Sequence, residues 1–266
     1  MKSGKSSKAL LLVGGFGTRL RPLTFSKPKP LVEFINKPIL SHQIEALKSV
    51  GVDEIVLAIN YQPKMMMEYI QEAESKYKIK ITVSKENEPL GTAGPIGLAK
   101  DILLTSEADE ILVFNSDVTC RFPLREMLEF HRSHQKEGTI ATTRVKDPSK
   151  FGVILSDENN KILDFVEKPS VFVGDNINAG LYIFNKKFLD RVEAKPMSIE
   201  REVFPQMARD GELYTFSLEG FWADIGQPLE YINGTRLYLN DALIRNSGEL
   251  TKGKNILGNV CIVSNI

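Results

Sequence analysis

Short apolar stretches recur along the first half of the chain and alternate with segments whose apolar residues follow a helical period. The apolar stretches are ALLLV, EIVLAI and EILVFN, at residues 9–13, 54–59 and 110–115. A strand of a parallel sheet is covered on both faces and loses polar alternation, so these stretches are predicted to be such strands. The intervening segments 38–51 and 122–138 each begin near a proline and end at a glycine, as helices often do.

This alternation of strands and helices predicts a doubly wound sheet, in which helices cover both faces and the crossovers are right-handed. From residue 139 onward strand-like segments dominate, which indicates a mixed sheet with an antiparallel extension. No linker rich in Gly, Ser or Pro separates the two halves. We therefore expect one α/β domain built on a doubly wound mixed sheet.

The last stretch of the chain, residues 241–266, has a different pattern. After a helix-like segment, Ile256, Gly258, Val260 and Ile262 recur at every second position. This spacing resembles the first coil of a hexapeptide β-helix, whose coils bury one another's faces and need about three repeats to be stable. We expect residues 241–266 to be a connector and the first coil of a β-helix that is cut short.

Composition limits the partners of the chain. The 266 residues carry 34 basic and 34 acidic side chains, so no overall field would attract nucleic acid or an anionic membrane. The apolar run near the N-terminus is too short for a membrane span. Cys120 and Cys261 lack CxxC spacing, which argues against a disulfide framework or a zinc site. We expect a globular protein of the reducing cytoplasm.

A glycine-rich turn follows the first predicted strand. Gly14, Gly15 and Gly17 can present backbone N–H groups to an anion. A dinucleotide fingerprint G-x-G-x-x-G is excluded, because Leu20 stands at its third glycine and prolines oppose a following helix. Next comes a proline-rich arm, expected to be extended, that carries Arg19, Arg21, Lys27 and Lys29. The turn and the arm together predict a triphosphate site, although a solvated basic loop has a similar composition.

The motifs on this loop and beyond it resemble the sugar-1-phosphate nucleotidylyltransferases. The chain carries GGFGTRLRPLTFSKPKPLVEFINKPIL, EPLGTAGP, NSD, FGV, VEKP, NAGLYIF and GFWADIGQP in that family's order. The resemblance covers residues 8–240 and implies a Rossmann-like nucleotidylyltransferase domain there. It also implies that residues 241–266 begin a left-handed β-helix. Finer details, such as NSDVTCRFP and SIEREVFPQMA, resemble the eukaryotic branch that uses GTP and mannose 1-phosphate.

The resemblance implies a reaction in which mannose 1-phosphate attacks the α-phosphorus of GTP, giving GDP-mannose and pyrophosphate. A sugar phosphate is already an oxygen nucleophile, so catalysis consists of positioning two anions and stabilising charge. By similarity, the catalytic residues are Arg19 and Lys29 on the triphosphate and Lys168 on the sugar phosphate. The resemblance assigns the nucleotide to Gly14, Gly15, Gly17, Thr18, Arg19, Lys29, Glu86, Glu88 and Gly91.

Two carboxylates are expected to bind Mg²⁺. Asp117 of NSD and Asp224 of FWADIG come from distant segments of the sequence. Mg²⁺ commonly takes one or two carboxylates together with substrate phosphates. Taken singly, Asp117 fits a helix cap or turn and Asp224 fits a turn equally well. The presence of both in the family's order favours a metal site.

The sugar and the base each require hydrogen-bonding groups. The resemblance assigns the sugar to Glu167, Asn178 and the backbone near Gly152, with Lys168 beside them. For the base, one carboxylate can accept both guanine donors, N1–H and the exocyclic amine. We expect Glu86 to accept these two bonds, with Glu88 as the second candidate. The alternative is that either glutamate is only a solvated charge on a loop.

Two alternative functions remain open at this stage. The first is a non-catalytic regulatory subunit, since some members of the family are of this kind. Four residues would distinguish an enzyme from such a subunit, and their presence favours an enzyme: Lys29, Asp117, Lys168 and Asp224. The second alternative keeps the chemistry but changes the substrate to another hexose 1-phosphate or another nucleotide. The expected protein partners are further copies of this chain and a homologous regulatory alpha subunit.

Overall fold

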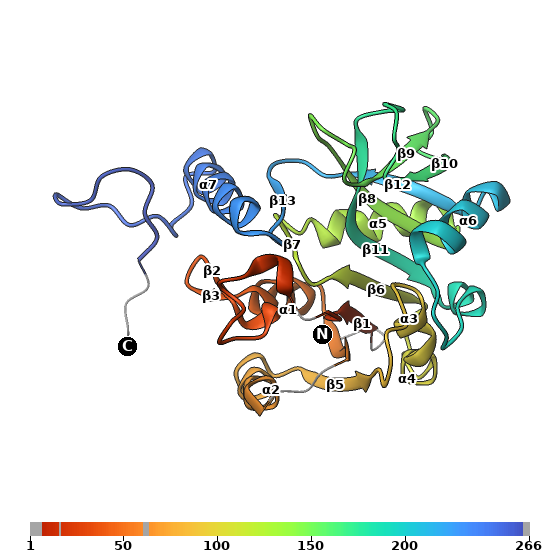
Figure 1. Cartoon of the computed structure of the whole chain (residues 1–266), viewed down its shortest axis with the longest axis horizontal. Helices are drawn as coiled ribbons and strands as arrows, with labels where there is room; N and C mark the ends of the chain where they lie inside the picture. Colours follow the sequence, from red (N-terminus) through yellow and green to blue (C-terminus); the bar gives the residue numbers. More distant parts are fainter. Residues whose placement is uncertain (1–6, 16, 61–63, 263–266) are drawn as a thin grey trace.

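The computed structural model describes residues 7–15, 17–60 and 64–262. Within these ranges a mixed sheet of nine strands forms the centre of the molecule (Figure 1). Seven of them lie in the order β10-β9-β11-β6-β1-β4-β5, and β8 pairs with both β11 and β12. The strands are β1 (Ser7–Leu12), β4 (Val52–Ile59), β5 (Lys80–Lys85), β6 (Glu110–Asn115), β8 (Gly138–Arg144), β9 (Gly152–Ser156), β10 (Ile162–Glu167), β11 (Asn176–Asn185) and β12 (Leu213–Ser217).

The sheet combines a parallel half with an antiparallel extension. β1 pairs in parallel with β4 and β6, and β4 pairs in parallel with β5. β11 runs antiparallel to β6 and to β8, and β9 and β10 form a further antiparallel pair. The three apolar stretches predicted to be buried strands correspond to β1, β4 and β6, so the predicted mixed sheet is confirmed.

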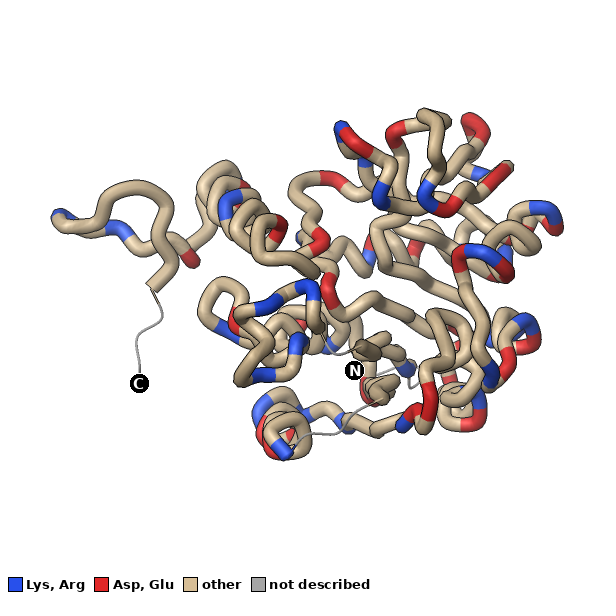
Figure 2. The backbone as a smooth tube through the Cα atoms, in the orientation of Figure 1, with Lys and Arg blue, Asp and Glu red and all other residues tan. Residues whose placement is uncertain are grey.

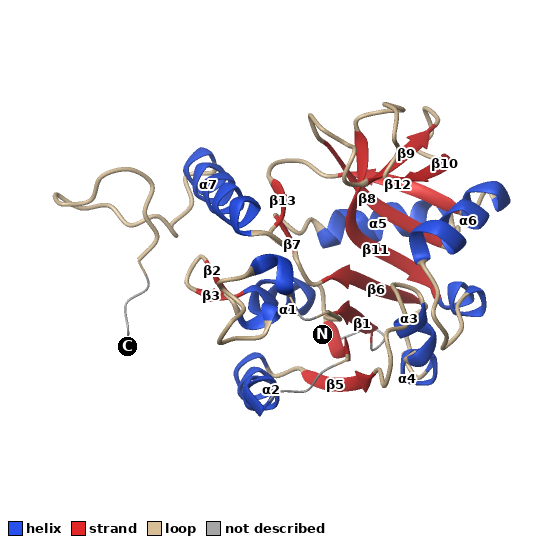
Figure 3. Cartoon of the chain, in the orientation of Figure 1, coloured by secondary structure: helices blue, strands red, loops and turns tan. Residues whose placement is uncertain are grey.

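Helices pack on both faces of the sheet (Figure 3). The face that carries Leu11 packs against α1 (Ile39–Ser49), α2 (Lys64–Tyr77) and α5 (Leu124–His134). The face that carries Leu10 packs against α3 (Gly94–Leu98), α4 (Lys100–Leu104) and α6 (Phe204–Asp210). Both leucines are 0% exposed, and successive residues of a strand point to opposite faces. This confirms the doubly wound α/β architecture.

The segment after β1 differs from the extended arm that its prolines predict. It forms two 3₁₀ helices, η1 (Thr18–Leu20) and η2 (Lys29–Leu31), joined by turns. The Thr24 hydroxyl donates a hydrogen bond to the Gly17 carbonyl at 2.7 Å, which closes the first turn. Pro30 lies in the first turn of η2, where a missing N–H costs nothing. The prediction of an extended arm was therefore wrong, and the basic residues lie on compact turns.

Two small sheets and a long helix complete the described part of the fold. The antiparallel pairs are β2 (Glu33–Phe34) with β3 (Lys37–Pro38), and β7 (Val118–Cys120) with β13 (Trp222–Asp224). Helix α7 (Pro228–Ile244) packs on β2 through Tyr231 and Tyr238, whose rings lie 5.7 Å and 6.0 Å from that of Phe34. It approaches β13 at Gly234, where an added Cβ atom would lie 3.1 Å from the Ala223 Cβ.

The segment after α7 extends away from the sheet (Figure 1). Residues 245–262 contain no helix or strand, and their contacts include a hydrogen bond of 2.7 Å from the Thr251 N–H to the Val260 carbonyl. The Asn36 side chain donates to the Cys261 carbonyl at 2.9 Å, which ties the segment to the β2–β3 turn. Residues 263–266 lie outside the described ranges, and the β-helix coil over 241–266 stays a prediction.

Charge is spread over the whole fold. Acidic and basic positions are interspersed along the chain (Figure 2), in keeping with 34 residues of each sign. None of the helices in the described ranges combines the length and the apolar composition needed to cross a bilayer.

Candidate functional site

The two predicted phosphate-binding segments leave the sheet at the same edge. β1 and β6 are parallel neighbours with Leu12 opposite Asn115, and the Ser116 N–H donates to the Leu12 carbonyl at 3.3 Å. The glycine turn after β1 and Asp117 after β6 are therefore close in space. Open α/β sheets bind ligands beyond the carboxyl ends of their strands, which is where both segments lie.

Asp117 and Asp224 are brought together because β13 pairs with β7. The Ile225 N–H donates to the Asp117 carbonyl at 2.9 Å. A Cβ atom placed on Gly226 would lie 2.8 Å from Oδ1 of Asp224 and 3.2 Å from Oδ2 of Asp117. The same point is 3.6 Å from Nζ of Lys29. The two carboxylates and the ammonium group therefore converge on one point, which a glycine leaves open.

The electrostatics of this cluster favour a further cation. Lys29 Nζ lies 2.5 Å from Asp117 Oδ2. Burial, followed by the negative charge of Asp117, raises the pKa of Asp224 to about 6, against the opposing effect of the Gly226 N–H. No group of three or more His, Cys, Asp or Glu side chains in the described residues could hold a metal ion by itself. A metal here would complete its coordination with water or substrate oxygens, as Mg²⁺ usually does.

A cavity of about 120 Å³ opens beside the two carboxylates. Its lining includes both predicted metal ligands and all four residues predicted for the sugar. The lining residues are Asn115, Asp117, Val118, Lys150, Phe151, Gly152, Glu167, Lys168, Asn178, Ala179, Gly180, Glu200, Trp222 and Asp224. The structure therefore brings the residues predicted for the sugar together with the predicted metal ligands.

The polar side chains of this cavity have defined positions. Lys168 Nζ lies 3.1 Å from Glu167 Oε1, and the Lys168 side chain is 59% exposed, so its ammonium lies at the rim. Asn178 donates to the Tyr182 hydroxyl and accepts from the Gly180 N–H, both at 2.9 Å. The Asn178 amide is thereby fixed beside the cavity.

The structure separates the two glutamates predicted to read the base. Glu86, directly after β5, is 4% exposed and accepts from the Leu90 N–H at 3.2 Å. A Cβ atom on Gly14 would lie 3.5 Å from Glu86 Oε1, so this carboxylate borders the glycine turn. Burial raises the pKa of Glu86, partly offset by the Leu90 N–H. Glu88 is exposed, and Gly91 follows with φ of 74°. Of the two glutamates, Glu86 is the one that borders the glycine turn, and its role as the base reader stays a prediction.

Two of the remaining residues predicted for the nucleotide lie beside Lys29. Gly15 and Lys29 line a cavity of about 250 Å³. A Cβ atom on Gly17 would lie 2.9 Å from the Lys29 Cβ, so this turn packs directly on the lysine. Thr18 and Arg19 are exposed on η1.

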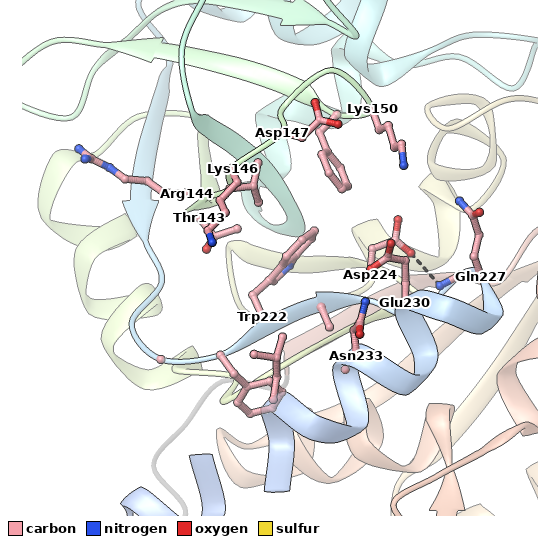
Figure 4. A pocket seen from close by; sticks show the side chains of 18 of the residues that line it. Thr143, Arg144, Lys146, Asp147, Lys150, Trp222, Asp224, Gln227, Glu230 and Asn233 are labelled. Atoms are coloured by element: carbon pink, nitrogen blue, oxygen red, sulfur yellow. Dashed lines mark hydrogen bonds between the residues drawn. The ribbon is translucent and has the colours of Figure 1, made fainter. Parts of the chain in front are cut away.

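A larger cavity of about 680 Å³ adjoins the same cluster (Figure 4). One wall is the loop at residues 143–150 and the other is the start of α7, with Trp222 between them. Its lining includes Arg19, Asp224 and Gly226. Arg19 therefore borders this second cavity rather than the sugar cavity.

Sequence reasoning gave no role to three polar residues of the sugar cavity: Asn115, Lys150 and Glu200. Asn115 opens the NSD motif, and Glu200 lies within SIEREVFPQMA, so both were visible in the motifs. Their approach to the cavity depends on how β6 and the segment before α6 pack, which the linear sequence does not reveal.

The chain is similar in sequence and in fold to known proteins. Residues 8–241 match the family model described as nucleotidyl transferase. The chain is 56% identical to mannose-1-phosphate guanylyltransferase 1 of Arabidopsis thaliana and 55% identical to mannose-1-phosphate guanylyltransferase catalytic subunit beta of Dictyostelium discoideum. Each alignment covers 96% of this chain and 71% of the relative. The crystal structure of HddC from Yersinia pseudotuberculosis with GMP-PN is 28% identical, with a TM-score of 0.71 over 87% of this chain and 99% of that chain.

Proposed function

Because the chain belongs to the nucleotidyl transferase family, we propose that it transfers the GMP moiety of GTP to mannose 1-phosphate, forming GDP-mannose and pyrophosphate. The relatives from Arabidopsis thaliana and Dictyostelium discoideum carry this activity in their names and share more than half of their aligned residues with the chain. The structural observation that carries the proposal is one cluster. Lys29, Asp117 and Asp224 converge beside a cavity whose rim holds Lys168.

The reaction is an in-line displacement at the α-phosphorus. An oxygen of mannose 1-phosphate forms the new bond to the α-phosphorus, the bond from the α-phosphorus to the oxygen that bridges the α- and β-phosphates breaks, and that oxygen leaves with the electron pair as part of pyrophosphate. Lys168 at the cavity rim is suited to hold the sugar phosphate. Lys29 and Arg19 are suited to hold the triphosphate and to stabilise the charge of the leaving group.

Asp117 and Asp224 are the residues that would hold a divalent metal ion, which we propose to be Mg²⁺. A bound ion supplies positive charge at the α-phosphate and the leaving group. The residues fit such an ion for two reasons. First, the carboxylates of Asp117 and Asp224 both approach the same point beside Gly226. Second, burial and the negative charge of Asp117 raise the pKa of Asp224, so a bound cation would offset unfavourable negative charge.

The nucleotide is proposed to lie along the glycine turn, with Gly14, Gly15, Gly17 and Thr18 around the phosphates and ribose and Glu86 on the base. The crystallised HddC complex with GMP-PN, in a chain of the same fold, supports a nucleotide site. The sugar is proposed to contact Glu167, Asn178 and the backbone of Gly152, all of which line the small cavity.

The finer organisation is also proposed. Residues 8–240 would form the catalytic domain, and residues 241–266 a connector leading into a β-helix. A homologous regulatory alpha subunit is supported by the name catalytic subunit beta of the relative from Dictyostelium discoideum, and self-association stays a prediction. A cytoplasmic location stays a prediction, in keeping with free thiols at Cys120 and Cys261. Sizing with and without the regulatory homologue tests the partners.

One assay tests the function and both alternatives. Pyrophosphate release is measured with GTP, ATP, UTP and dTTP, each with mannose 1-phosphate, glucose 1-phosphate and galactose 1-phosphate. The proposal expects the highest kcat/KM for GTP with mannose 1-phosphate. A preference for another sugar phosphate would support the second alternative. No turnover with any pair, combined with measurable GDP-mannose binding, would support a non-catalytic regulatory subunit.

A further inference from the structure

Glu200 is a carboxylate of the sugar cavity to which the proposed mechanism gives no role. It lies in η4 (Ile199–Val203), a π-helical turn that leads into α6. It lines the cavity together with Glu167, Lys168 and Asn178. π-helical turns are frequent at functional sites. The side chain of Glu200 is therefore placed where a ligand of this cavity could contact it.

One oxygen of Glu200 is held by two hydroxyl groups, and the other faces no donor within the described part of the chain. Oε2 accepts from the Thr92 hydroxyl at 2.6 Å and from the Ser198 hydroxyl at 2.9 Å. Thr92 Oγ1 in turn accepts from the Ile199 N–H at 2.9 Å, which orients the threonine hydroxyl toward the carboxylate. Among the residues that the structure describes, Oε1 of Glu200 has no hydrogen-bond donor. This oxygen keeps its acceptor capacity for a ligand.

Thr92 is itself fixed by tight backbone packing. The N–H groups of Thr92 and Ala93 donate to the Met197 carbonyl at 3.1 Å and 3.0 Å, and the Met197 N–H donates to the Leu90 carbonyl at 3.1 Å. A Cβ atom on Gly91 would lie 2.5 Å from the Met197 carbonyl oxygen, so only a glycine permits this approach. The segment that precedes α3 and the segment that precedes η4 are therefore held together by backbone hydrogen bonds.

We propose that Glu200 is a specificity-determining residue for the sugar, with Oε1 accepting hydrogen bonds from hexose hydroxyls, and that Thr92 is its positioning residue. This inference rests on the proposed function, because it places a sugar 1-phosphate in the small cavity. Hydrogen bonds to an ionised acceptor are about twice as strong as neutral ones. Because Oε2 of Glu200 is held by two hydrogen bonds, Oε1 has a fixed position and favours sugars that place a hydroxyl there. Thr92 acts only through Glu200.

The first experiment uses Glu200→Gln with mannose 1-phosphate and a panel of analogues that each lack one ring hydroxyl. The variant is expected to raise the KM for mannose 1-phosphate by about 10- to 100-fold, the range for a bond to a charged group, and the KM for GTP by less than about two-fold. The analogue that lacks the hydroxyl bound by Glu200 should have a higher KM than mannose 1-phosphate with the wild type. With the variant, the KM of that analogue should be no higher than that of mannose 1-phosphate. An unchanged sugar KM, or equal analogue penalties in both enzymes, would overturn the assignment.

The second experiment separates positioning from simple structural support. Thr92→Val removes the hydroxyl at nearly constant volume and is expected to reproduce the higher sugar KM, whereas Thr92→Ser keeps the hydroxyl and should restore the wild-type value. Glu193→Gln is the matched control, because Glu193 is 69% exposed and pairs only with Lys195 at 3.0 Å among the described residues. A rise in the GTP KM instead, or a serine variant as impaired as the valine variant, contradicts the positioning role.

Two further measurements keep the inference testable. If Thr92→Val lowers the melting temperature sharply, Ser198→Ala removes the other donor to Oε2 and should raise the sugar KM in the same direction. If the wild type turns over no substrate pair, the proposed function fails. Titration calorimetry of mannose 1-phosphate against wild type and Glu200→Gln then decides the assignment alone: a roughly tenfold weaker Kd supports it, and an equal Kd overturns it.

Discussion

Lys29 Nζ lies 2.5 Å from Asp117 Oδ2, so the segment after β1 and the segment after β6 meet in an ion pair at the proposed phosphate site. Both side chains are mostly buried, at 13% and 20% exposure. Burial lowers the local dielectric constant and strengthens the attraction between the charges. A triphosphate would compete with Asp117 for Lys29, and a metal ion would compete with Lys29 for Asp117. We expect the pair to exchange partners when substrates bind.

Replacing Lys29 should therefore damage catalysis far more than replacing a neighbouring lysine. Lys29→Gln is expected to lower kcat/KM for GTP by about 100- to 1,000-fold, as when one preorganised charge-stabilising group is removed. Lys27→Gln is the matched control, because Lys27 is 44% exposed and pairs with the exposed Glu33. Steady-state kinetics with varied GTP checks the pair of variants. Similar losses in both would show a diffuse basic loop rather than a specific phosphate contact.

The two proposed metal ligands give a second prediction. Asp117→Asn and Asp224→Asn should each abolish most turnover and weaken Mn²⁺ binding in the presence of GTP, because an amide lacks the negative charge of a carboxylate. The fold should remain, since both side chains lie at strand ends rather than in the apolar cores. Asp53→Asn, at an exposed position on β4, serves as the control. Wild-type rates in either variant would remove the metal assignment.

A single methyl group at Gly226 tests whether the cluster is as close as the structure places it. In Gly226→Ala the new Cβ atom would lie 2.8 Å from Asp224 Oδ1, closer than real Cβ contacts, so the carboxylate has to move. The displaced atom is the end of a side chain, so the melting temperature should change little. Turnover should fall, because a 1 Å misplacement of a catalytic group can cost about 100-fold. Full activity with an unchanged melting temperature would mean that Asp224 is not held there during turnover.

The sequence predicted the sheet well because its strands are set by local composition. The apolar stretches at 9–13, 54–59 and 110–115 are buried on both faces, so their pattern reflects the tertiary environment directly. The arm after β1 was predicted wrongly, because prolines favour extended residues before them but are also tolerated in the first turn of a 3₁₀ helix, as Pro30 is. The conformational preference of the prolines therefore did not decide between an extended arm and a 3₁₀ helix.

Site residues could be predicted where they belong to a recognisable sequence motif. They could not be predicted where only tertiary packing brings them to the site. Asp117 and Asp224 were identified as a pair from motifs that lie far apart in sequence, and the β7–β13 pairing brings them together. Glu200 was visible only as part of the motif SIEREVFPQMA, which gave it no role. Its role depends on the widened π-helical turn and on the hydroxyl of Thr92, and no spacing in the sequence indicates either.

Burial distinguishes the two candidate readers of the base and gives a fourth prediction. Glu86 is 4% exposed and borders Gly14, whereas Glu88 is exposed. Glu86→Gln should reduce the preference for GTP over ATP and dTTP by about 1 to 3 kcal/mol in kcat/KM, the cost of an unsatisfied buried polar group. The KM for mannose 1-phosphate should change little, and Glu88→Gln should leave selectivity intact. If Glu88→Gln loses the preference and Glu86→Gln keeps it, the reader is Glu88.

The same carboxylate predicts a pH dependence whose sign can be worked out. Burial raises the pKa of Glu86 above its usual value of 4.5, so this side chain takes up a proton at a higher pH than an ordinary glutamate does. Only the ionised form accepts from both guanine donors, because a protonated carboxyl group turns one acceptor into a donor.

Over a range from pH 8 to pH 4, the advantage of wild type over Glu86→Gln in kcat/KM for GTP should therefore be largest at the alkaline end and shrink at the acidic end, as Glu86 takes up its proton. Protonation of the substrate phosphates affects both enzymes equally and cancels in this ratio. The measurement is the ratio of the two kcat/KM values across that range, with Glu88→Gln run in parallel as a variant whose ratio to wild type should not vary. A ratio for Glu86→Gln that stays constant, or one that grows on acidification, would show that an ionised Glu86 does not read the base.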